Sequence, residues 1–366
     1  MKRVWTSRKK SKAVLAVAAS GVVAGAMMAA PPASGMSVGE AFGGLNGPRG
    51  VAAGPHGGRL VVTQADGTVS RVVRKGPDKG DIIKIGKVPN TGLAPAVDIN
   101  RRGQIFVVTT DGENKGAGKL YRIRPGKGRT MVADIKKYQR SDPDKFDLEK
   151  NPKESNPYGV AALNDGSVLV ADAAGNDLLR VMPNGKIVTV ARVKPRTVKS
   201  PDLGEEGPPP GTKMPAEAVI TSVAVGKDGS YYIGELRGFP ATPGTSQIWR
   251  IKPGTRNAVC DPAKPNKGKC KRHADGLTSV VDLAAGPNGS VFAVELSKMS
   301  WLALEAEPAI PGAEVGALVK IAHDTSVQRE VAKGKLIIPG GVERTRGGAV
   351  FVTTPMFGPG AVMRVK

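Results

Sequence analysis

The sequence predicts an all-β chain: a six-bladed β-propeller of four-stranded antiparallel blades, closed by an N-terminal strand and preceded by a signal peptide. Three observations predict this fold. The 366 residues include 48 Gly and 29 Pro, while aromatic residues make up only 4%. A pattern of two short apolar strands joined by a tight turn occurs six times, and a third strand with a basic residue follows each copy. Short apolar runs separated by Gly and Pro are typical of β-rich chains.

Residues 1–35 have the composition of a secretion signal. Six Lys and Arg residues lie within the first twelve positions, an apolar stretch covers 13–30, and Pro31 and Pro32 precede a small-residue site at 33–35. A basic start, an apolar segment and a small-residue cleavage site are the parts of a signal peptide. We therefore expect a secreted or cell-envelope protein whose single domain spans 36–366. Cleavage or retention as an anchor stays open, because the apolar stretch is long, and so does the export route, Sec or twin-arginine.

The repeat decides the fold. Each copy has a short apolar strand, a turn with Gly, and a second apolar strand that ends in a polar residue. The six copies span 50–64, 96–109, 159–172, 222–235, 282–295 and 341–354. Five share one length, and the first has one extra turn residue. A unit repeated in this way indicates a repeat architecture in which neighbouring units pack on each other.

The third strand of each repeat has an apolar residue, then Arg or Lys, then Val or Ile, with Ser70 as the one polar exception at the first place. The basic residues are Arg71, Arg122, Arg180, Arg250, Lys320 and Arg364. We interpret this residue as structural, at a strand edge or between blades.

A fourth strand follows in most repeats, and its expected positions are 81–88, 129–135, 186–193 and 327–331. In the fourth repeat it is obscured by a loop with two cysteines, and the sixth repeat has none because the chain ends on its third strand. A strand near 38–45 can supply the missing one. Pairing the two chain ends removes the exposed edges of an open ring.

Cys260 and Cys270 are the two cysteines of the chain. In an oxidising compartment we expect them to form a disulfide that closes one hairpin loop and contributes about 2–3 kcal/mol. A zinc site would need further ligands, and His273 is the one candidate nearby.

The net charge is +22, and the six basic residues of the signal reduce it to +16 for the remaining chain. This charge favours peripheral contact with an anionic cell envelope, or it is simply the basic surface of a soluble protein. Nucleic acid is not the expected partner, because the protein is expected to be exported and its Lys and Arg are scattered through turns rather than gathered in a stripe with aromatic residues.

Residues 157–181, which contain Pro-Tyr-Gly-Val-Ala, Val-Leu-Val-Ala-Asp and Leu-Arg-Val, resemble an NHL repeat. From about Gly47 to its end the chain resembles the ScyD/ScyE family of secreted bacterial propellers. It is also distantly similar to the SMP-30/gluconolactonase and virginiamycin B lyase propellers. The resemblance implies a six-bladed propeller and leaves the activity open, since this architecture hosts both enzymes and binding proteins.

Loop lengths differ between the two faces of the expected ring. The turns between strands 1 and 2 are tight, whereas the opposite face carries most of the long connections. These long connections are 111–118, 136–158, 194–221, 236–246, 296–316 and 355–360. Insertions gathered on one face of a repeat protein mark its binding side, so we expect a ligand or partner at this long-loop face. The alternative is that the loops only cover the channel mouth.

Several polar residues are expected at the long-loop end of the blades. Those that end second strands are Gln64, Thr109, Asp172, Glu235, Glu295 and Thr354. Asn156, Asp282 and, slightly deeper, Asp98 lie near the start of first strands, close to the axis. Carboxylate and amide oxygens are the ligands that Ca²⁺ prefers.

In the SMP-30-like lactonases, Glu, Asn and Asp from different blades hold a metal that acts as a Lewis acid. The resemblance therefore implies Asn156, Glu235, Asp282 and Glu295 as ligands of one Ca²⁺-type ion. A structural interpretation competes with this one: Asp172 matches a turn Asp of NHL blades, and Glu235 and Glu295 could bond backbone amides in their own blades.

Two functions stay open. The first is a monomeric secreted propeller without a cofactor that binds an unidentified small molecule, or an envelope or protein partner, through the long-loop face. Phe239 and Trp301 would be anchors there, unless they only pack their own loops. The second is a lactonase or lyase that depends on a Ca²⁺-type metal. No hydrolase, nucleotide-binding or zinc-protease motif is present, and the three His residues fall in expected turns or beside the cysteines, so a His general base is not evident.

Overall fold

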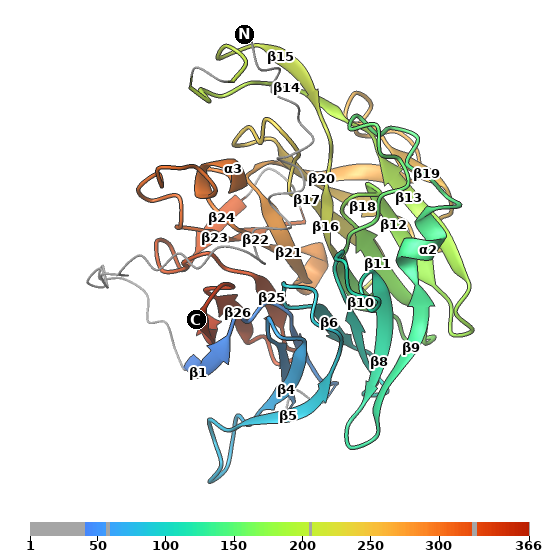
Figure 1. Cartoon of the computed structure of the whole chain (residues 1–366), viewed down its shortest axis with the longest axis vertical. Coiled ribbons are helices and arrows are strands. Elements are labelled where there is room, and N and C mark those ends of the chain that lie inside the picture. The colour runs from blue at the N-terminus through green and yellow to red at the C-terminus, as the bar shows by residue number, and fades with distance from the viewer. Residues whose placement is uncertain (1–40, 56–58, 205–206, 324–327, 366) are drawn as a thin grey trace.

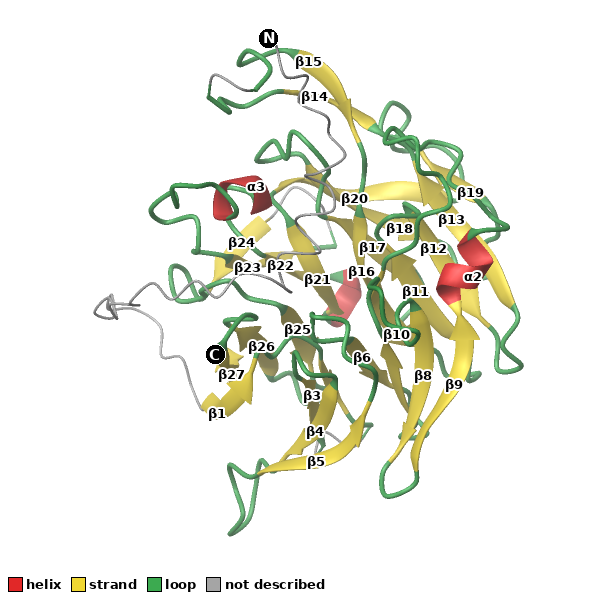
Figure 2. Cartoon of the chain, viewed as in Figure 1, coloured by secondary structure: helices red, strands yellow, loops and turns green. Residues whose placement is uncertain are grey.

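The computed structural model describes residues 41–365 except 56–58, 205–206 and 324–327, so the expected signal peptide lies outside the described residues. Within the described residues, six blades of four antiparallel strands follow one another around a central channel; blade 6 takes its fourth strand from the N-terminal end of the chain, and blade 3 carries an additional parallel strand. The chain passes once around this ring from its blue to its red end (Figure 1), and strands dominate throughout (Figure 2). The predicted all-β, six-bladed propeller is confirmed.

The first strand of each blade lies at the channel and the fourth at the outer rim. Blade 1 contains β2 (Val51–Ala53), β3 (Leu60–Thr63), β4 (Thr68–Val72) and β5 (Ile82–Lys87); blade 2 contains β6 (Ala96–Ile99), β7 (Ile105–Val108), β8 (Lys119–Arg124) and β9 (Gly128–Asp134); blade 3 contains β10 (Pro157–Ala162), β11 (Val168–Asp172), β12 (Asp177–Val181) and β13 (Ile187–Val193). Blade 4 contains β16 (Ile220–Val225), β17 (Tyr231–Glu235), β18 (Ser246–Ile251) and β20 (Cys270–Leu277); blade 5 contains β21 (Val280–Ala285), β22 (Val291–Glu295), β23 (Ala317–Ile321) and β24 (Gln328–Val331); blade 6 contains β25 (Gly341–Arg344), β26 (Val350–Thr354), β27 (Pro359–Val365) and β1 (Ala41–Asn46).

The second strand of every blade is buried along its whole length. It lies between strands 1 and 3 and is covered by a neighbouring blade on each face, so its sequence is a continuous apolar run. Buried hydrophobic clusters fill the contacts between neighbouring blades; Leu169, Ile233 and Trp249, for example, pack between blades 3 and 4. The outer strands are more exposed, as β5 and β9 show.

The N-terminal strand closes the ring as predicted. β1 pairs antiparallel with β27, with Ala41 opposite Met363 and Asn46 opposite Pro359. Phe42 and Leu45 are buried in the cluster between blades 6 and 1. The sixth blade thus obtains its fourth strand from the other end of the chain, and β27 is not left as an open edge.

The 1–2 turns are tight because Gly adopts a conformation that other residues rarely adopt. Gly166 has a φ of +88° and Gly229 a φ of +80°, and only Gly enters this region without strain. In the same turns Asp165 and Asp228 each accept a hydrogen bond from the backbone N–H two residues later, at 3.0 Å in both cases.

The Cys260–Cys270 disulfide is confirmed, but the segment that it closes is not a simple hairpin. β19 (Ala258–Cys260) runs parallel to β13 as a fifth strand of blade 3, while β20 begins at Cys270 in blade 4. The disulfide therefore links the outer parts of two neighbouring blades.

The remaining elements lie in the connections between strands. A hairpin of β14 (Arg196–Lys199) and β15 (Lys213–Ala216) projects from the ring (Figure 1). Among the described residues, the helical segments are α2 (Ile135–Gln139), η3 (Pro287–Gly289) and α3 (Trp301–Leu304). Within the part of the chain that the structure describes, none of the helices has the length and apolarity needed to cross a membrane.

Candidate functional site

The central channel contains a cavity of about 650 Å³. Every described residue that lines it comes from a first strand or from a 1–2 turn: Val51 from blade 1, and 97–101, 160–164, 223–227, 229, 282–287, 342–344 and 346 from the other blades. Because these turns form its rim, the cavity opens on the tight-turn face. A side chamber of about 160 Å³ adjoins it between blades 6, 1 and 2 and shares Asp98 and Glu343 with the main chamber.

At the long-loop end, Arg49 lies across the channel. Its Nη1 donates to the carbonyl of Ala94 at 2.9 Å, and its Nη2 donates to the carbonyl of Tyr158. The guanidinium also stacks on the Tyr158 ring, 3.6 Å from the centroid. Tyr158 and Leu93 belong to a buried hydrophobic cluster that includes Trp301 from a long loop. The cavity is therefore closed toward the long-loop face.

Backbone groups contribute to the wall of the cavity. Each first strand pairs only with the second strand of its own blade, so its inner edge presents backbone N–H and C=O groups to the channel. Two carboxylates accept hydrogen bonds from N–H groups of this edge. Asp98 accepts a hydrogen bond from the N–H of Ala162 at 2.7 Å, and Asp282 accepts one from the N–H of Val342 at 2.8 Å. Each carboxylate thus bridges two neighbouring blades.

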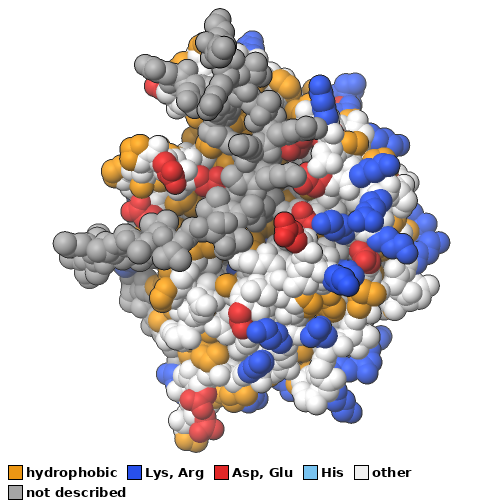
Figure 3. Space-filling view, in the orientation of Figure 1, with side chains coloured by type: hydrophobic (Ala, Val, Ile, Leu, Met, Phe, Trp, Pro, Cys, Tyr) orange, Lys and Arg blue, Asp and Glu red, His pale blue; other side chains and the backbone are white. Residues whose placement is uncertain are grey.

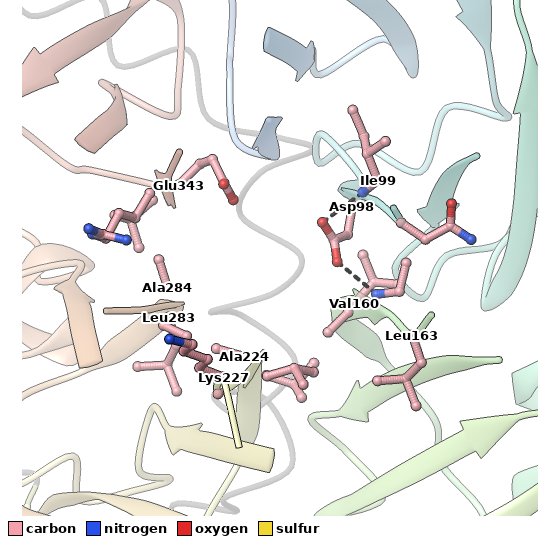
Figure 4. Close-up of a pocket in the computed structure, with 18 of the residues that line it drawn as sticks. Asp98, Ile99, Val160, Leu163, Ala224, Lys227, Leu283, Ala284 and Glu343 are labelled. Atoms are coloured by element: carbon pink, nitrogen blue, oxygen red, sulfur yellow. Dashed lines mark hydrogen bonds between the residues drawn. The ribbon is translucent and has the colours of Figure 1, made fainter. Parts of the chain in front are cut away.

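Glu343 is the third carboxylate of the cavity wall. Asp98 and Glu343 occupy one position of the repeat, at which the other four blades have Ala52, Ala161, Ala224 and Ala284. Figure 4 shows the carboxylates of Asp98 and Glu343 pointing into the cavity from two sides. Within the described residues Glu343 has no hydrogen bond or ion pair, whereas Asp98 and Asp282 do.

The three carboxyl groups hold their protons more tightly than usual. Burial raises the pKa of Asp98 to about 6 and the pKa of Asp282 to about 7. Burial, followed by the charges of Asp98 and Asp282, raises the pKa of Glu343 well above its ordinary value, and Arg344 offsets part of this. Carboxyl groups with raised pKa values that share a cavity are typical of functional sites.

The rim of the cavity is basic. Arg101, Lys227 and Arg346 lie in the 1–2 turns and are exposed, and Arg344 is half-buried beside them. The acidic residues among the lining residues are Asp98, Asp282 and Glu343 alone. The described part of the cavity is thus acidic at its inner wall and basic at its mouth.

Of the residues predicted for the site, Asp98 and Asp282 line the cavity, whereas Asp172 and Glu235 lie within the blades. Asp172 accepts hydrogen bonds from the N–H groups of Asn156 and Gly175, at 2.7 and 3.1 Å. Glu235 is fully buried, forms an ion pair with Arg237, and accepts a hydrogen bond from Nε1 of Trp249 at 2.6 Å.

The other predicted polar residues also have hydrogen-bond partners, some of them in a neighbouring blade or connection. Gln64 accepts from the N–H of Asn46, Thr109 donates to the carbonyl of Gly116, Asn156 accepts from the N–H of Asp111, Glu295 accepts from the N–H of Thr278, and Thr354 donates to the carbonyl of Ile337. These bonds hold the long connections against the ends of the strands.

The four residues implied as metal ligands do not come together. Asp282 lines the cavity, while Asn156, Glu235 and Glu295 are engaged in the bonds described above. Over the described ranges, no group of three or more His, Cys, Asp and Glu residues is arranged to hold a metal ion. These residues therefore do not fit the metal that the resemblance implies.

The two aromatic residues proposed as anchors differ in exposure. Trp301 is buried, and its Nε1 donates to the carbonyl of Arg237 at 2.8 Å, so it fastens its loop to the neighbouring blade. Phe239 is half-buried. In Figure 3 the Lys and Arg side chains are spread over much of the visible face, with acidic residues among them, rather than forming one stripe.

Sequence reasoning missed Glu343, Arg49 and the basic rim. The sequence did contain a signal for Glu343. Four blades have Ala at this position of the repeat, so the acidic residues Asp98 and Glu343 depart from the pattern. Arg49 gave no such signal, because it precedes the first copy of the repeat.

No protein-family model matches the sequence, and no curated protein matches it either. Solved structures do resemble the chain. A glucose dehydrogenase is 13% identical with a TM-score of 0.57, and the match covers 91% of this chain and 99% of that one. The PQQ-bound aldose sugar dehydrogenase of Streptomyces coelicolor is 14% identical with a TM-score of 0.54, covering 92% and 100%. A gluconolactonase of Xanthomonas campestris is 9% identical with a TM-score of 0.53, covering 90% and 91%. At these identities the likeness establishes the fold of this chain, a six-bladed β-propeller.

Proposed function

We propose that this protein binds a small polar molecule in its channel cavity and admits it from the tight-turn face. The observation that carries the proposal is Glu343, a carboxylate without a partner among the described residues that points into a 650 Å³ cavity. Placing a charged group there without a partner is unfavourable for folding alone. A bound molecule that hydrogen-bonds to it would supply the missing partner.

The size and chemistry of the cavity support this proposal. Sites for small molecules typically have volumes of about 300–1,000 Å³ and combine apolar walls with a few convergent polar groups. Here Val160, Val223 and Leu283 supply apolar wall, while the carboxylates and the inner edges of the first strands supply polar groups. A small polar molecule could therefore be surrounded on most sides.

The proposed site differs from the long-loop face that the sequence favours. A partner at that face stays a prediction, but Arg49 and its cluster separate it from the cavity. We also propose that the protein is exported, on the basis of residues 1–35, and that it finds its ligand outside the cytoplasm.

The test is retention of small molecules from a mixed library, followed by mass spectrometry of what the purified protein holds. Ala162 lines the cavity, so a Phe at this position should reduce the space in it, and we expect Ala162→Phe to lose the compounds that the wild type retains. Ala309→Phe is the matched control, because Ala309 is exposed in the long 296–316 connection and does not line the cavity. A wild type that retains nothing, or equal retention by Ala162→Phe, would refute the proposal.

Lactone hydrolysis in the same cavity is the second candidate function. It is favoured by the pKa of Asp282 near 7 and that of Asp98 near 6, values that suit a general acid or base close to neutral pH. The gluconolactonase among the structural neighbours has the same fold. A panel of lactones assayed with the wild type and Asp282→Asn tests it. Turnover that is absent, or that survives the substitution, would leave binding as the proposed function.

A further inference from the structure

The two ends of the cavity carry opposite charge. Asp98, Asp282 and Glu343 lie on the first strands, whereas the basic residues lie on the turns that follow those strands or next to them. Arg101 follows Asp98 by three residues, and Arg346 follows Glu343 by the same interval. Three residues of chain span at most roughly 10 Å, and here the last of them lies in the turn. A small molecule can therefore reach from the carboxylates of the first strands to the basic residues of the turns.

Neither a simple cation nor a simple anion satisfies both ends. A cation would meet the acidic inner wall but would have to pass Arg101, Lys227 and Arg346 at the mouth. An anion would meet the mouth, but inside it would face Asp98, Asp282 and Glu343. The cavity therefore favours a ligand with one positive and one negative group. A ligand group that has the same sign as the residues it meets is repelled, and an uncharged group leaves those residues without a partner.

The side chamber is lined by some of the same charged residues as the main chamber. Asp98 and Glu343 line both chambers, and so do Arg101, Arg344 and Arg346. Blade 2 therefore presents one acid and one base, and blade 6 one acid and two bases, to the region where the chambers join. Glu343 is the acid with an unused hydrogen-bonding capacity, since Asp98 is engaged with the N–H groups of Ile99 and Ala162.

We propose that the ligand is a small zwitterion whose ammonium group binds at Glu343, between Asp98 and Asp282, and whose phosphate or carboxylate binds at Arg101, Arg344 and Arg346. The ammonium supplies hydrogen-bond donors to Glu343, and an anion can accept two parallel bonds from an Arg at the rim. This inference rests on the proposed function, because it identifies the class of ligand for the same cavity.

A matched set of three probes tests the class of ligand. Glucosamine 6-phosphate carries both charges, glucose 6-phosphate lacks the amine, and glucosamine lacks the phosphate. Isothermal titration calorimetry between pH 5 and 7 measures the three affinities. We expect glucosamine 6-phosphate to bind about tenfold more tightly than either of the others, because each of the others lacks one charged contact with the protein. Glu343→Gln should remove the preference for the amine, so that glucosamine 6-phosphate and glucose 6-phosphate bind equally. Arg346→Ala should weaken both phosphates.

Proton release gives an independent readout. With pKa values of about 7 and about 6, Asp282 and Asp98 are partly protonated at pH 6 in the free protein, and burial raises the pKa of Glu343 as well. An ammonium group beside them, with Arg49 and Arg344 as the neighbouring fixed charges, favours their ionised forms. Binding of glucosamine 6-phosphate at pH 6 should therefore release protons to the buffer, and affinity should rise from pH 5 to pH 7. Titrations in buffers of different ionisation enthalpy measure this release, which Glu343→Gln should reduce.

Two controls on exposed residues outside the cavity, Glu113→Gln and Arg140→Ala, should behave like the wild type. Equal binding of the two phosphates, or a preference that survives Glu343→Gln, overturns the zwitterion. If none of the three probes binds while library compounds are still retained and lost in Ala162→Phe, the ligand class is wrong and the cavity function stands. If the library also yields nothing, the proposed function itself has failed.

Discussion

The recurring basic residue of the third strand has a clear role in two blades. In blade 3, Nε of Arg180 donates to Oγ of Ser167 at 2.9 Å and Nη2 donates to Asp165. In blade 4, Arg250 makes the same two bonds to Ser230 and Asp228. The Arg therefore braces the 1–2 turn of its own blade: its role here is structural, as the sequence indicates, but it lies at the turn rather than at a strand edge or between blades.

We expect Arg180→Ala to lower the free energy of unfolding by about 1 kcal/mol, because it removes two hydrogen bonds from a partly exposed turn. Arg364→Ala is the matched control, since the corresponding turn in blade 6 has Gly347 and Ala349 where blade 3 has the acceptors Asp165 and Ser167. Urea denaturation of both variants measures the difference. Equal effects at the two positions would contradict the bracing role.

Glu343 provides a prediction about pH. Its pKa in the folded protein is raised by burial and by the charges of Asp98 and Asp282. When the pKa of a group is higher in the folded than in the unfolded protein, its protonated form stabilises the folded state. This contribution is complete below the pKa of the unfolded state, about 4.3 for Glu, and it is lost as the pH rises through the pKa of the folded state. We therefore expect Glu343→Gln to be more stable than the wild type at pH 8, by on the order of 1 kcal/mol.

The difference should shrink toward pH 4, where the carboxyl group is protonated in the folded state and mostly protonated in the unfolded state. Urea denaturation at pH 4, 6 and 8 measures it, with Glu113→Gln as the exposed control. A variant that is no more stable than the wild type at pH 8, or a difference that does not depend on pH, would show that the side chain is not under strain from desolvation.

At the scale of single elements, the disulfide fastens a strand that has few other contacts. β19 has three residues and pairs only through its parallel contact with the end of β13. Cys260 at its end is buried and bonded to Cys270, the first residue of β20. The bond therefore holds blade 3 and blade 4 together at their outer edges.

Replacing Cys260 and Cys270 with Ser should lower the free energy of unfolding by about 2–3 kcal/mol, the usual contribution of a disulfide across a loop of this length. Hydrogen exchange should increase most at β19 and at the end of β13, and little at β16, because the effect is local. Uniform loss of protection across all blades would instead indicate that the disulfide stabilises the ring as a whole.

At the scale of the whole molecule, the fold depends on contact between the two ends of the chain. β1 is paired with β27, and Phe42 and Leu45 lie in one cluster with Leu60 of blade 1 and Phe351 of blade 6. Without β1 the edge of β27 would be free, and free strand edges promote association.

A chain that begins at Pro48 should therefore have a markedly lower melting temperature than one that begins at Met36, and it should form oligomers. Burying Phe42 and Leu45 alone contributes roughly 3–6 kcal/mol. Thermal unfolding and size-exclusion chromatography compare the two chains. If the shorter chain is equally stable and monomeric, β1 is not the strand that closes the ring.

The sequence by itself determined the blade and the number of blades. A blade is a local unit of four consecutive strands, so its apolar runs, its Gly turns and its third-strand Arg all lie within about fifty residues and repeat visibly. The closing strand followed from the same count, because one strand was missing at the end. The disulfide followed because the chain has two cysteines and ten positions separate them.

Only the tertiary structure decided where the cavity lies and which end of it is open. Asp98, Asp282 and Glu343 are far apart along the chain and meet only because the ring closes. The polar ends of the second strands looked equivalent to them in sequence, yet Asp172 and Glu235 are bonded within their own blades. Arg49 closes the long-loop end through bonds to the carbonyls of two other blades, a contact that no local pattern encodes. Local periodicity determines which strands form. Which end of the channel is open depends on side chains that come from distant parts of the sequence and meet across the channel.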